Sequence, residues 1–154
     1  MTDSDIRKQR ESIWLKARKM PHGFVPSRET DKEYLDLLQQ AAALGHAESM
    51  NKLGDYAFRR GTLVEAFYWK MMSELHGFMP SQPSVMQVRQ AWVLRGYPTE
   101  YGNVSPAFTA EKGSFARAIL RLRSGVDRVG ARRRLKELVA ANVAEARLYA
   151  EKHR

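Results

Sequence analysis

Apolar residues recur at spacings of three and four along most of the chain, and no segment alternates convincingly between apolar and polar positions. Spacings of three and four gather apolar side chains on one helix face, whereas a half-buried strand alternates with period two. The pattern predicts an all-α fold of about seven or eight helices and no sheet. The first helix is expected at Ser4–Lys19, and the others at about 30–44, 47–60, 62–76, 84–95, 105–124, 127–141 and from 143 toward the C-terminus.

The expected helix boundaries rest on glycine, proline and capping residues. Gly45 and Gly77 follow helical segments, at positions where a left-handed residue ends a helix. Thr30–Glu33 and Thr62–Glu65 have the spacing of a capping box, in which the Thr hydroxyl accepts a hydrogen bond from the amide three residues on. Ser105, which precedes a proline, predicts an N-cap with proline at the first helical position.

Residues 45–77 are predicted to form a helical hairpin with Leu53 and Phe67 in its core. The run 67–72 combines aromatic and methionine side chains, which also occur on surfaces that stack nucleobases or adapt to ligands. Its helical spacing favours packing in the core, and Tyr68 is the side chain expected to be the exception.

An internal repeat emerges when the sequence is shifted by 65 residues. The shift aligns large and small apolar positions of two segments and brings a helix stop, Gly77, onto Asn142. The aligned residues are Met50, Leu53, Gly54 and Ala57 with Phe115, Ala118, Ile119 and Leu122, and Ala66 with Ala131. Half of this period also separates Gly45 from Gly77, so the predicted unit is a helix pair.

One such unit, at about 45–77, resembles the Sel-one-like repeat, a relative of the tetratricopeptide repeat. The residues that carry the resemblance are Ala41–Glu48, Leu53–Tyr56, Gly61, Glu65–Trp69 and Gly77. The resemblance implies a short right-handed α-solenoid of antiparallel helix pairs, whose first helices line a concave surface that binds proteins or peptides. On matching positions of this sequence, the partner-binding groove would contain Asn51, Asp55, Phe58 and Arg59.

We expect a single helical-repeat domain over residues 1–154. Residues 1–20 form a basic amphipathic helix, which is expected to cap the first repeat, as a solenoid requires, rather than to bind a membrane. Regular repeats follow at 30–77, then an irregular insert at 78–104 that contains three prolines, and a basic C-terminal repeat at 105–154.

The 154-residue chain carries 26 Lys and Arg against 17 Asp and Glu, a formal net charge of +9, and has no cysteine. The absence of cysteine excludes disulfides, thiolate metal sites and a cysteine nucleophile. The first twenty residues lack the apolar run of a signal peptide, and no stretch approaches the roughly 20 apolar residues of a membrane helix. These features predict a cytoplasmic protein.

The positive charge is concentrated near the C-terminus, because residues 105–154 hold twelve basic and five acidic side chains. Guanidinium groups bind phosphate and carboxylate in bidentate fashion, so such a patch suits an anionic partner. A solvated surface that keeps the protein soluble is the other interpretation. The candidate anionic-partner patch consists of Arg117, Arg121, Arg128, Arg132, Arg133 and Lys136.

No pattern of catalytic or metal-binding residues is recognised in the sequence. The histidines at 22, 46, 76 and 153 lack the spacing of metal ligands, and no nucleophile-elbow or nucleotide-binding glycine motif occurs. We therefore expect a protein that is not an enzyme and has no cofactor, no metal and no small-molecule substrate.

The leading functional prediction is a non-enzymatic protein-interaction module or adaptor, which binds an acidic protein or peptide through the concave groove and the basic C-terminal surface. The alternative is a nucleic-acid-associated protein that binds phosphates through its C-terminal arginine cluster.

Overall fold

The computed structural model describes residues 2–20, 29–100 and 104–153, and for residues 29–31 the backbone alone. Helices hold 79 % of the described residues and none of these residues lies in a strand, so the all-α prediction is confirmed. The elements are α1 (Asp3–Lys19), α2 (Glu29–Ala43), α3 (Ala47–Arg60), α4 (Leu63–Leu75), the 3-10 helix η1 (Met79–Ser81), α5 (Gln82–Leu94), α6 (Ala110–Ser124), α7 (Arg128–Ala140) and α8 (Ala144–Lys152).

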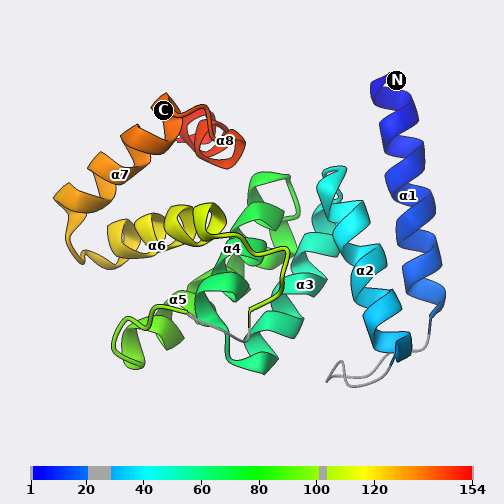
Figure 1. The fold of residues 1–154 in the computed structure, drawn as a ribbon, viewed down its shortest axis with the longest axis horizontal. Helices are drawn as coiled ribbons and strands as arrows, with labels where there is room; N and C mark the ends of the chain where they lie inside the picture. The colour runs from blue at the N-terminus through cyan, green and yellow to red at the C-terminus, as the bar shows by residue number, and fades with distance from the viewer. Residues whose placement is uncertain (1, 21–28, 101–103, 154) are drawn as a thin grey trace.

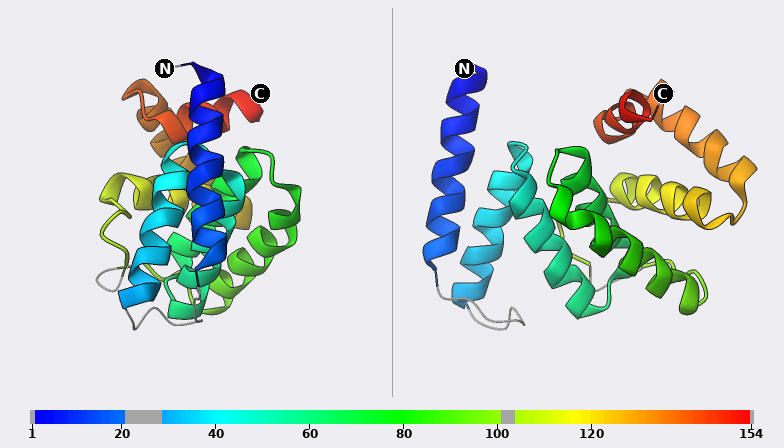
Figure 2. Two further views of the ribbon diagram at one scale, coloured as in Figure 1. Left: turned by 90° about the vertical axis from the view of Figure 1, so that its right-hand side faces the viewer. Right: turned by 180° about the vertical axis from the view of Figure 1, so that it is seen from behind.

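The helices are arranged as an open U (Figures 1 and 2). One arm contains α1 packed on α2, the other contains α7 and α8, and α3 and α4 lie between them. Helix α4 packs against α3, α5, α6 and α8, and α3 in turn packs against α2, so the α3–α4 pair joins both arms. The predicted hairpin at 45–77 is confirmed, because α3 and α4 are the most extensively packed pair.

Helix α4 is the centre of the core. Twelve of its thirteen residues are buried, including Phe67, Met71 and the charged Glu65 and Lys70. A helix that is apolar on every face is typically buried on every face, and the sequence LVEAFYWKMMSEL is of that kind. Tyr68 is 3 % exposed, so the expectation that it would be the exception to core packing is wrong.

In the described chain no helix is both long and apolar enough to cross a bilayer.

The helix stops lie where the sequence places them. Gly45, Gly61 and Gly77 have φ values of 90°, 87° and 94°, which glycine adopts without steric cost. Asn142, the residue aligned with Gly77 by the repeat, also has a positive φ of 65°. Asparagine is among the few other residues that tolerate this conformation.

The capping box predicted at Thr62–Glu65 differs in the structure, and the one predicted at Thr30–Glu33 lies partly outside the described residues. At the start of α4, the Thr62 hydroxyl lies 3.1 Å from the Ala57 carbonyl and does not accept from an amide. The carboxylate of Glu100 takes that role, accepting from the amides of Val64 at 2.6 Å and Glu65 at 2.9 Å. A carboxylate at a helix N-terminus is favoured by the helix dipole. Helix α2 already begins before Thr30, whose side chain lies outside the described residues.

The predicted helix start at Ser105 is wrong, because α6 begins at Ala110 with Thr109 as its N-cap. The Ser105 amide donates to a carboxylate oxygen of Glu65 at 3.2 Å, and its hydroxyl accepts from the Gln39 side chain at 2.9 Å. The Glu65 carboxylate is buried, and a buried carboxylate is stable only when hydrogen-bond donors surround it. Ser105 therefore serves tertiary contacts with α2 and α4.

His46 joins α1 to the start of α3. It is the N-cap of α3, where its Nδ1 accepts from the Ser49 amide at 3.2 Å, and its ring lies 5.0 Å from the ring of Trp14 in α1. Burial lowers the pKa of His46, with Arg10 acting in the same direction and Glu11 and Glu48 opposing it. The neutral imidazole therefore acts as the hydrogen-bond acceptor of this cap.

We predict that Leu53→Ala lowers the free energy of unfolding by about 2–5 kcal/mol, because Leu53 is only 5 % exposed and its truncation leaves a cavity. Urea denaturation measures the loss. Leu94→Ala is the matched control, since Leu94 is 86 % exposed and its truncation should cost less than about 0.5 kcal/mol. Equal losses for the two variants would show that the inner face of α3 is misassigned.

We predict a pH-dependent loss of stability that depends on His46. The pKa of the folded state is below the ordinary value of 6.5, so the unfolded chain binds more protons and stability rises with pH. The contribution of His46 is complete above pH 6.5 and is lost as the pH falls through the lowered pKa of the folded state. His46→Asn retains a capping acceptor and should remove this component of the pH dependence, measured by denaturation between about pH 5 and 8. Identical pH profiles for the two proteins would contradict it.

Candidate functional site

Two of the four expected groove residues, Asn51 and Asp55, are bound to Lys70 of α4. The ammonium Nζ donates to Asn51 Oδ1 at 2.8 Å and to Asp55 Oδ1 at 2.5 Å. Lys70 is 3 % exposed, and burial lowers its pKa although the bond to Asp55 raises it. The two polar side chains of α3 therefore satisfy a buried charge within the protein.

Gly54 makes this contact possible. A Cβ atom at Gly54 would lie 2.9 Å from the Cγ and Cδ atoms of Lys70, closer than real side chains approach. The absence of a side chain at this position lets the lysine stem cross the face of α3. The sequence singled out Gly54 as a small repeat position but offered no signal that Lys70 lies across it.

The other two expected groove residues lie differently. Phe58 is half-buried and packs against the core, whereas Arg59 is exposed. The structure thus places all four residues on α3, but Asn51 and Asp55 already accept hydrogen bonds from Lys70.

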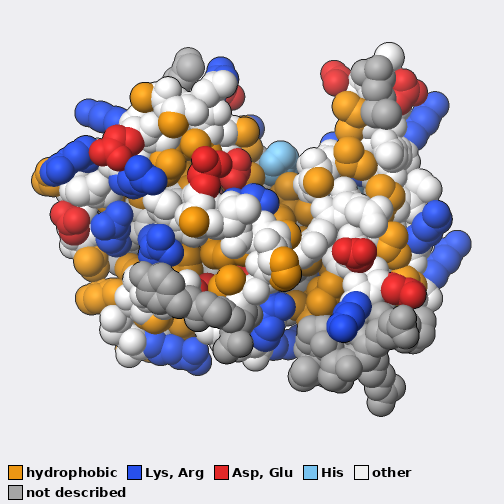
Figure 3. Space-filling model, viewed as in Figure 1, with side chains coloured by type: hydrophobic (Ala, Val, Ile, Leu, Met, Phe, Trp, Pro, Cys, Tyr) orange, Lys and Arg blue, Asp and Glu red, His pale blue; other side chains and the backbone are white. Residues whose placement is uncertain are grey.

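A concave cleft lies instead between α2, α4, α6 and α8, with a volume of about 430 Å³. Figure 3 shows a hollow in the surface between the two arms of the U. The cleft combines aromatic and methionine side chains with a few polar groups, a composition typical of binding pockets. Its lining residues are Gln39, Ala42, Ala43, Gly45, Met50, Tyr68, Trp69, Met72, His76, Ala107, Lys112, Ala144, Glu145 and Leu148.

Polar contacts across the cleft tie α4 to α6 and α8. The Tyr68 hydroxyl donates to Glu145 Oε2 at 3.3 Å, and burial together with this carboxylate raises the pKa of Tyr68. Lys112 Nζ lies 5.7 Å from the ring centroids of both Tyr68 and Trp69. Such cation–π contacts hold the ammonium over the aromatic wall.

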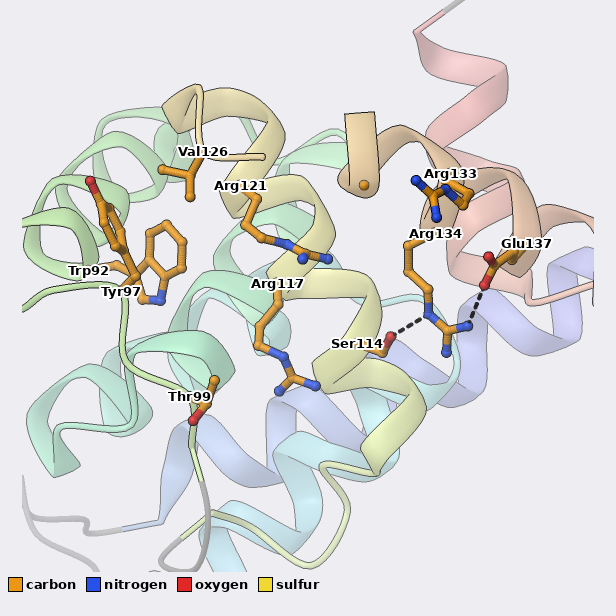
Figure 4. Close-up of a pocket in the computed structure, with 11 residues that line it drawn as sticks. Trp92, Tyr97, Thr99, Ser114, Arg117, Arg121, Val126, Arg133, Arg134 and Glu137 are labelled. Carbon is orange, nitrogen blue, oxygen red and sulfur yellow. Dashed lines mark hydrogen bonds and ion pairs between the residues drawn. The ribbon is translucent and has the colours of Figure 1, made fainter. Parts of the chain in front are cut away.

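The predicted basic patch is divided by the structure. Arg117 and Arg121 of α6 and Arg133 of α7 line a second cavity of about 430 Å³, together with Arg134 (Figure 4). The remaining patch residues Arg128, Arg132 and Lys136 are exposed and do not line it. The other lining residues are Trp92, Tyr97, Thr99, Ser114, Val126, Gly130 and Glu137.

One wall of this arginine pocket is held by two hydrogen bonds of Arg134, of which one joins α7 to α6 and the other lies within α7. Arg134 Nε donates to the Ser114 hydroxyl at 2.8 Å, and its NH1 donates to Glu137 Oε2 at 2.9 Å. Arg134 lies in the basic region that the sequence indicates, but it was not one of the six residues of the candidate patch. Its neighbours on α7 are chemically alike, so only the packing of α7 on α6 distinguishes it.

The histidines occupy helix ends. His76 is the C-cap of α4, where the helix dipole favours a protonated imidazole, but partial burial and the cations Arg10 and Lys152 lower its pKa. The ring of His153 stacks on Tyr149 with centroids 4.1 Å apart. Among the described residues, no three histidine or acidic side chains are placed to hold one metal ion. His22 lies outside the described residues.

Comparison with protein-family models, curated proteins and solved structures finds no significant match to this chain. The function of the protein is therefore inferred from the geometry of its two cavities.

We predict that Gly54→Ala lowers the free energy of unfolding by about 1–3 kcal/mol, because the new methyl group overlaps the Lys70 stem. In a Lys70→Ala background the overlap is gone, so the same substitution should cost much less. A double-mutant cycle by chemical denaturation measures the difference. Additive losses would contradict the proposed clash.

Proposed function

We propose that this protein is a non-enzymatic protein-interaction module, which binds an acidic segment of a partner protein in the concave cleft. The observation that carries the proposal is the combination of an aromatic and methionine-lined floor on α4 with two projecting arms. Such a cleft accommodates an apolar anchor side chain, and aromatic contacts are common at binding hot spots.

The charges around the cleft favour an acidic partner. Arg10 on α1 and Lys152 on α8 both lower the pKa of His76, which lines the cleft, so cations of the two arms act on the same region. Lys112 contributes a further ammonium, and Glu145, which accepts from the neutral Tyr68 hydroxyl, is the one carboxylate among the lining residues. A positive rim attracts acidic segments and accelerates their association.

The succession of helices supports the same proposal. Helices α1 with α2, α3 with α4, and α6 with α7 pack as sequence-adjacent pairs. We interpret these pairs as a short right-handed α-solenoid of the Sel-one-like kind, in which the concave side is the binding surface. The exposed Arg128, Arg132 and Lys136 would extend the basic surface beside it.

Site-specific photo-crosslinking tests the function. A photoreactive residue at Ala43, which is exposed and lines the cleft, should capture a protein from extract, and capture should survive nuclease treatment. The same residue at Leu94, which is exposed on α5, is the positional control. Loss of capture after nuclease treatment would favour the nucleic-acid alternative, which the exposed arginines of α7 support.

We predict that Ala43→Glu weakens binding of the captured partner by about tenfold or more, because like charges across an interface oppose association. Leu94→Glu makes the same charge change outside the cleft and should alter the affinity less than about twofold. Calorimetry with the purified partner gives both values. Equal weakening by the two variants would assign the effect to overall charge and contradict the cleft.

A further inference from the structure

We propose that the arginine pocket between α5, α6 and α7 binds a nucleoside phosphate. The phosphate would lie between the guanidinium groups of Arg117, Arg121 and Arg133, and the base would lie against Tyr97. This site is separate from the concave cleft and does not depend on the function proposed for it, since the two cavities share no lining residue.

The pocket contains cationic donors that the protein leaves without matching acceptors. Arg121 Nε is buried and has no hydrogen-bond partner among the described residues, and the carboxylate of Asp127 lies 3.7 Å from its NH1. Arg117 is half-buried, and no described carboxylate lies within 4.0 Å of it. Leaving a buried donor unsatisfied is costly, and an anion held beside the half-buried Arg121 and Arg117 side chains would offset that cost through its charge.

The charge of the lining matches a phosphate group. Four arginines line the pocket against one carboxylate, Glu137, and that carboxylate is bound to Arg134. Arg117 and Arg133 have no described carboxylate within 4.0 Å, and Arg121 has only the Asp127 carboxylate at 3.7 Å, so these three cations line the cavity from two helices (Figure 4). Planar guanidinium groups bind phosphate oxygens in pairs, which suits a dianion better than a single carboxylate.

An aromatic wall stands beside the arginines. Tyr97 lines the pocket, is 46 % exposed and lies with its ring centroid 5.1 Å from that of Trp92. Trp92 is 2 % exposed and its indole N–H donates to the Pro98 carbonyl at 2.9 Å, which anchors the loop that carries the tyrosine. An exposed ring on a fixed support is a stacking surface for a base.

The backbone at Tyr97 supports a functional role for this ring. Its φ is 61°, a conformation that is costly for a bulky side chain, yet the chain places tyrosine there rather than glycine. Strained residues of this kind are concentrated at ligand-binding sites. The pocket volume of about 430 Å³ is that of a small-molecule site and holds one nucleotide rather than a stretch of duplex.

Calorimetric titration of the full chain with ADP, pyrophosphate and adenosine tests the site. ADP should bind about tenfold more tightly than pyrophosphate, because stacking of the base adds to the phosphate contacts. Adenosine should bind at least tenfold more weakly than ADP. No heat with ADP at millimolar concentration would overturn the proposal, and equal affinity for ADP and pyrophosphate would overturn its nucleoside part.

Variants locate the binding. Arg117→Gln combined with Arg121→Gln should weaken both ADP and pyrophosphate by about tenfold or more, since charge-assisted hydrogen bonds are lost. Arg128→Gln combined with Arg132→Gln makes the same charge change at exposed positions and should change either affinity less than about twofold. Equal losses in the two double variants would assign binding to net charge and overturn the site.

Two further variants separate folding and stacking from phosphate binding. Arg133→Gln alters an exposed side chain of the pocket, so its unfolding transition should match the wild type while both affinities fall. Tyr97→Asn keeps a residue that tolerates positive φ and should reduce ADP affinity to that of pyrophosphate. Unchanged ADP affinity in both variants would contradict the pocket.

Discussion

Burial of α4 on all sides is the constraint on which the rest of the structure depends. The helix carries two charged residues into the core, Glu65 at 1 % exposure and Lys70 at 3 %. Removing the partner of a buried charge destabilises a protein by about 3–5 kcal/mol, so each of these residues must be matched by its neighbours. Their partners come from α3 and from the segment that leads into α6.

The two matched charges organise different parts of the fold. Lys70 holds Asn51 and Asp55 and so sets the close approach of α3 and α4. Glu65 accepts from Arg60 at 2.6 Å and from the Ser105 amide at 3.2 Å. The connection from α5 to α6 is thereby fixed against the start of α4, where Glu100 also caps the helix. Packing of α6 on this centre then positions the arginine pocket.

The two cavities differ in the chemistry of the residues that line them. The concave cleft has an aromatic and methionine floor with few charges, which suits an apolar anchor of a protein segment. The arginine pocket has guanidinium groups with an aromatic wall, which suits a phosphorylated small molecule. Helix α6 contributes to both, with Lys112 near its start and Arg121 near its end. The two candidate sites are therefore connected through a single helix.

The sequence by itself determined the helical class, the hairpin at 45–77 and the helix stops, because these depend on local spacing and on residues such as Gly77 and Asn142 that tolerate positive φ. It also located the basic region, since charge density is a property of composition. Tertiary structure alone decided that Glu100 and not Thr62 caps α4, and that Asn51 and Asp55 bind Lys70. It also selected the pocket arginines from several chemically identical ones. These outcomes join residues 15 to 36 positions apart, and the choice among equivalent partners at such separations is made by packing, which no local pattern encodes.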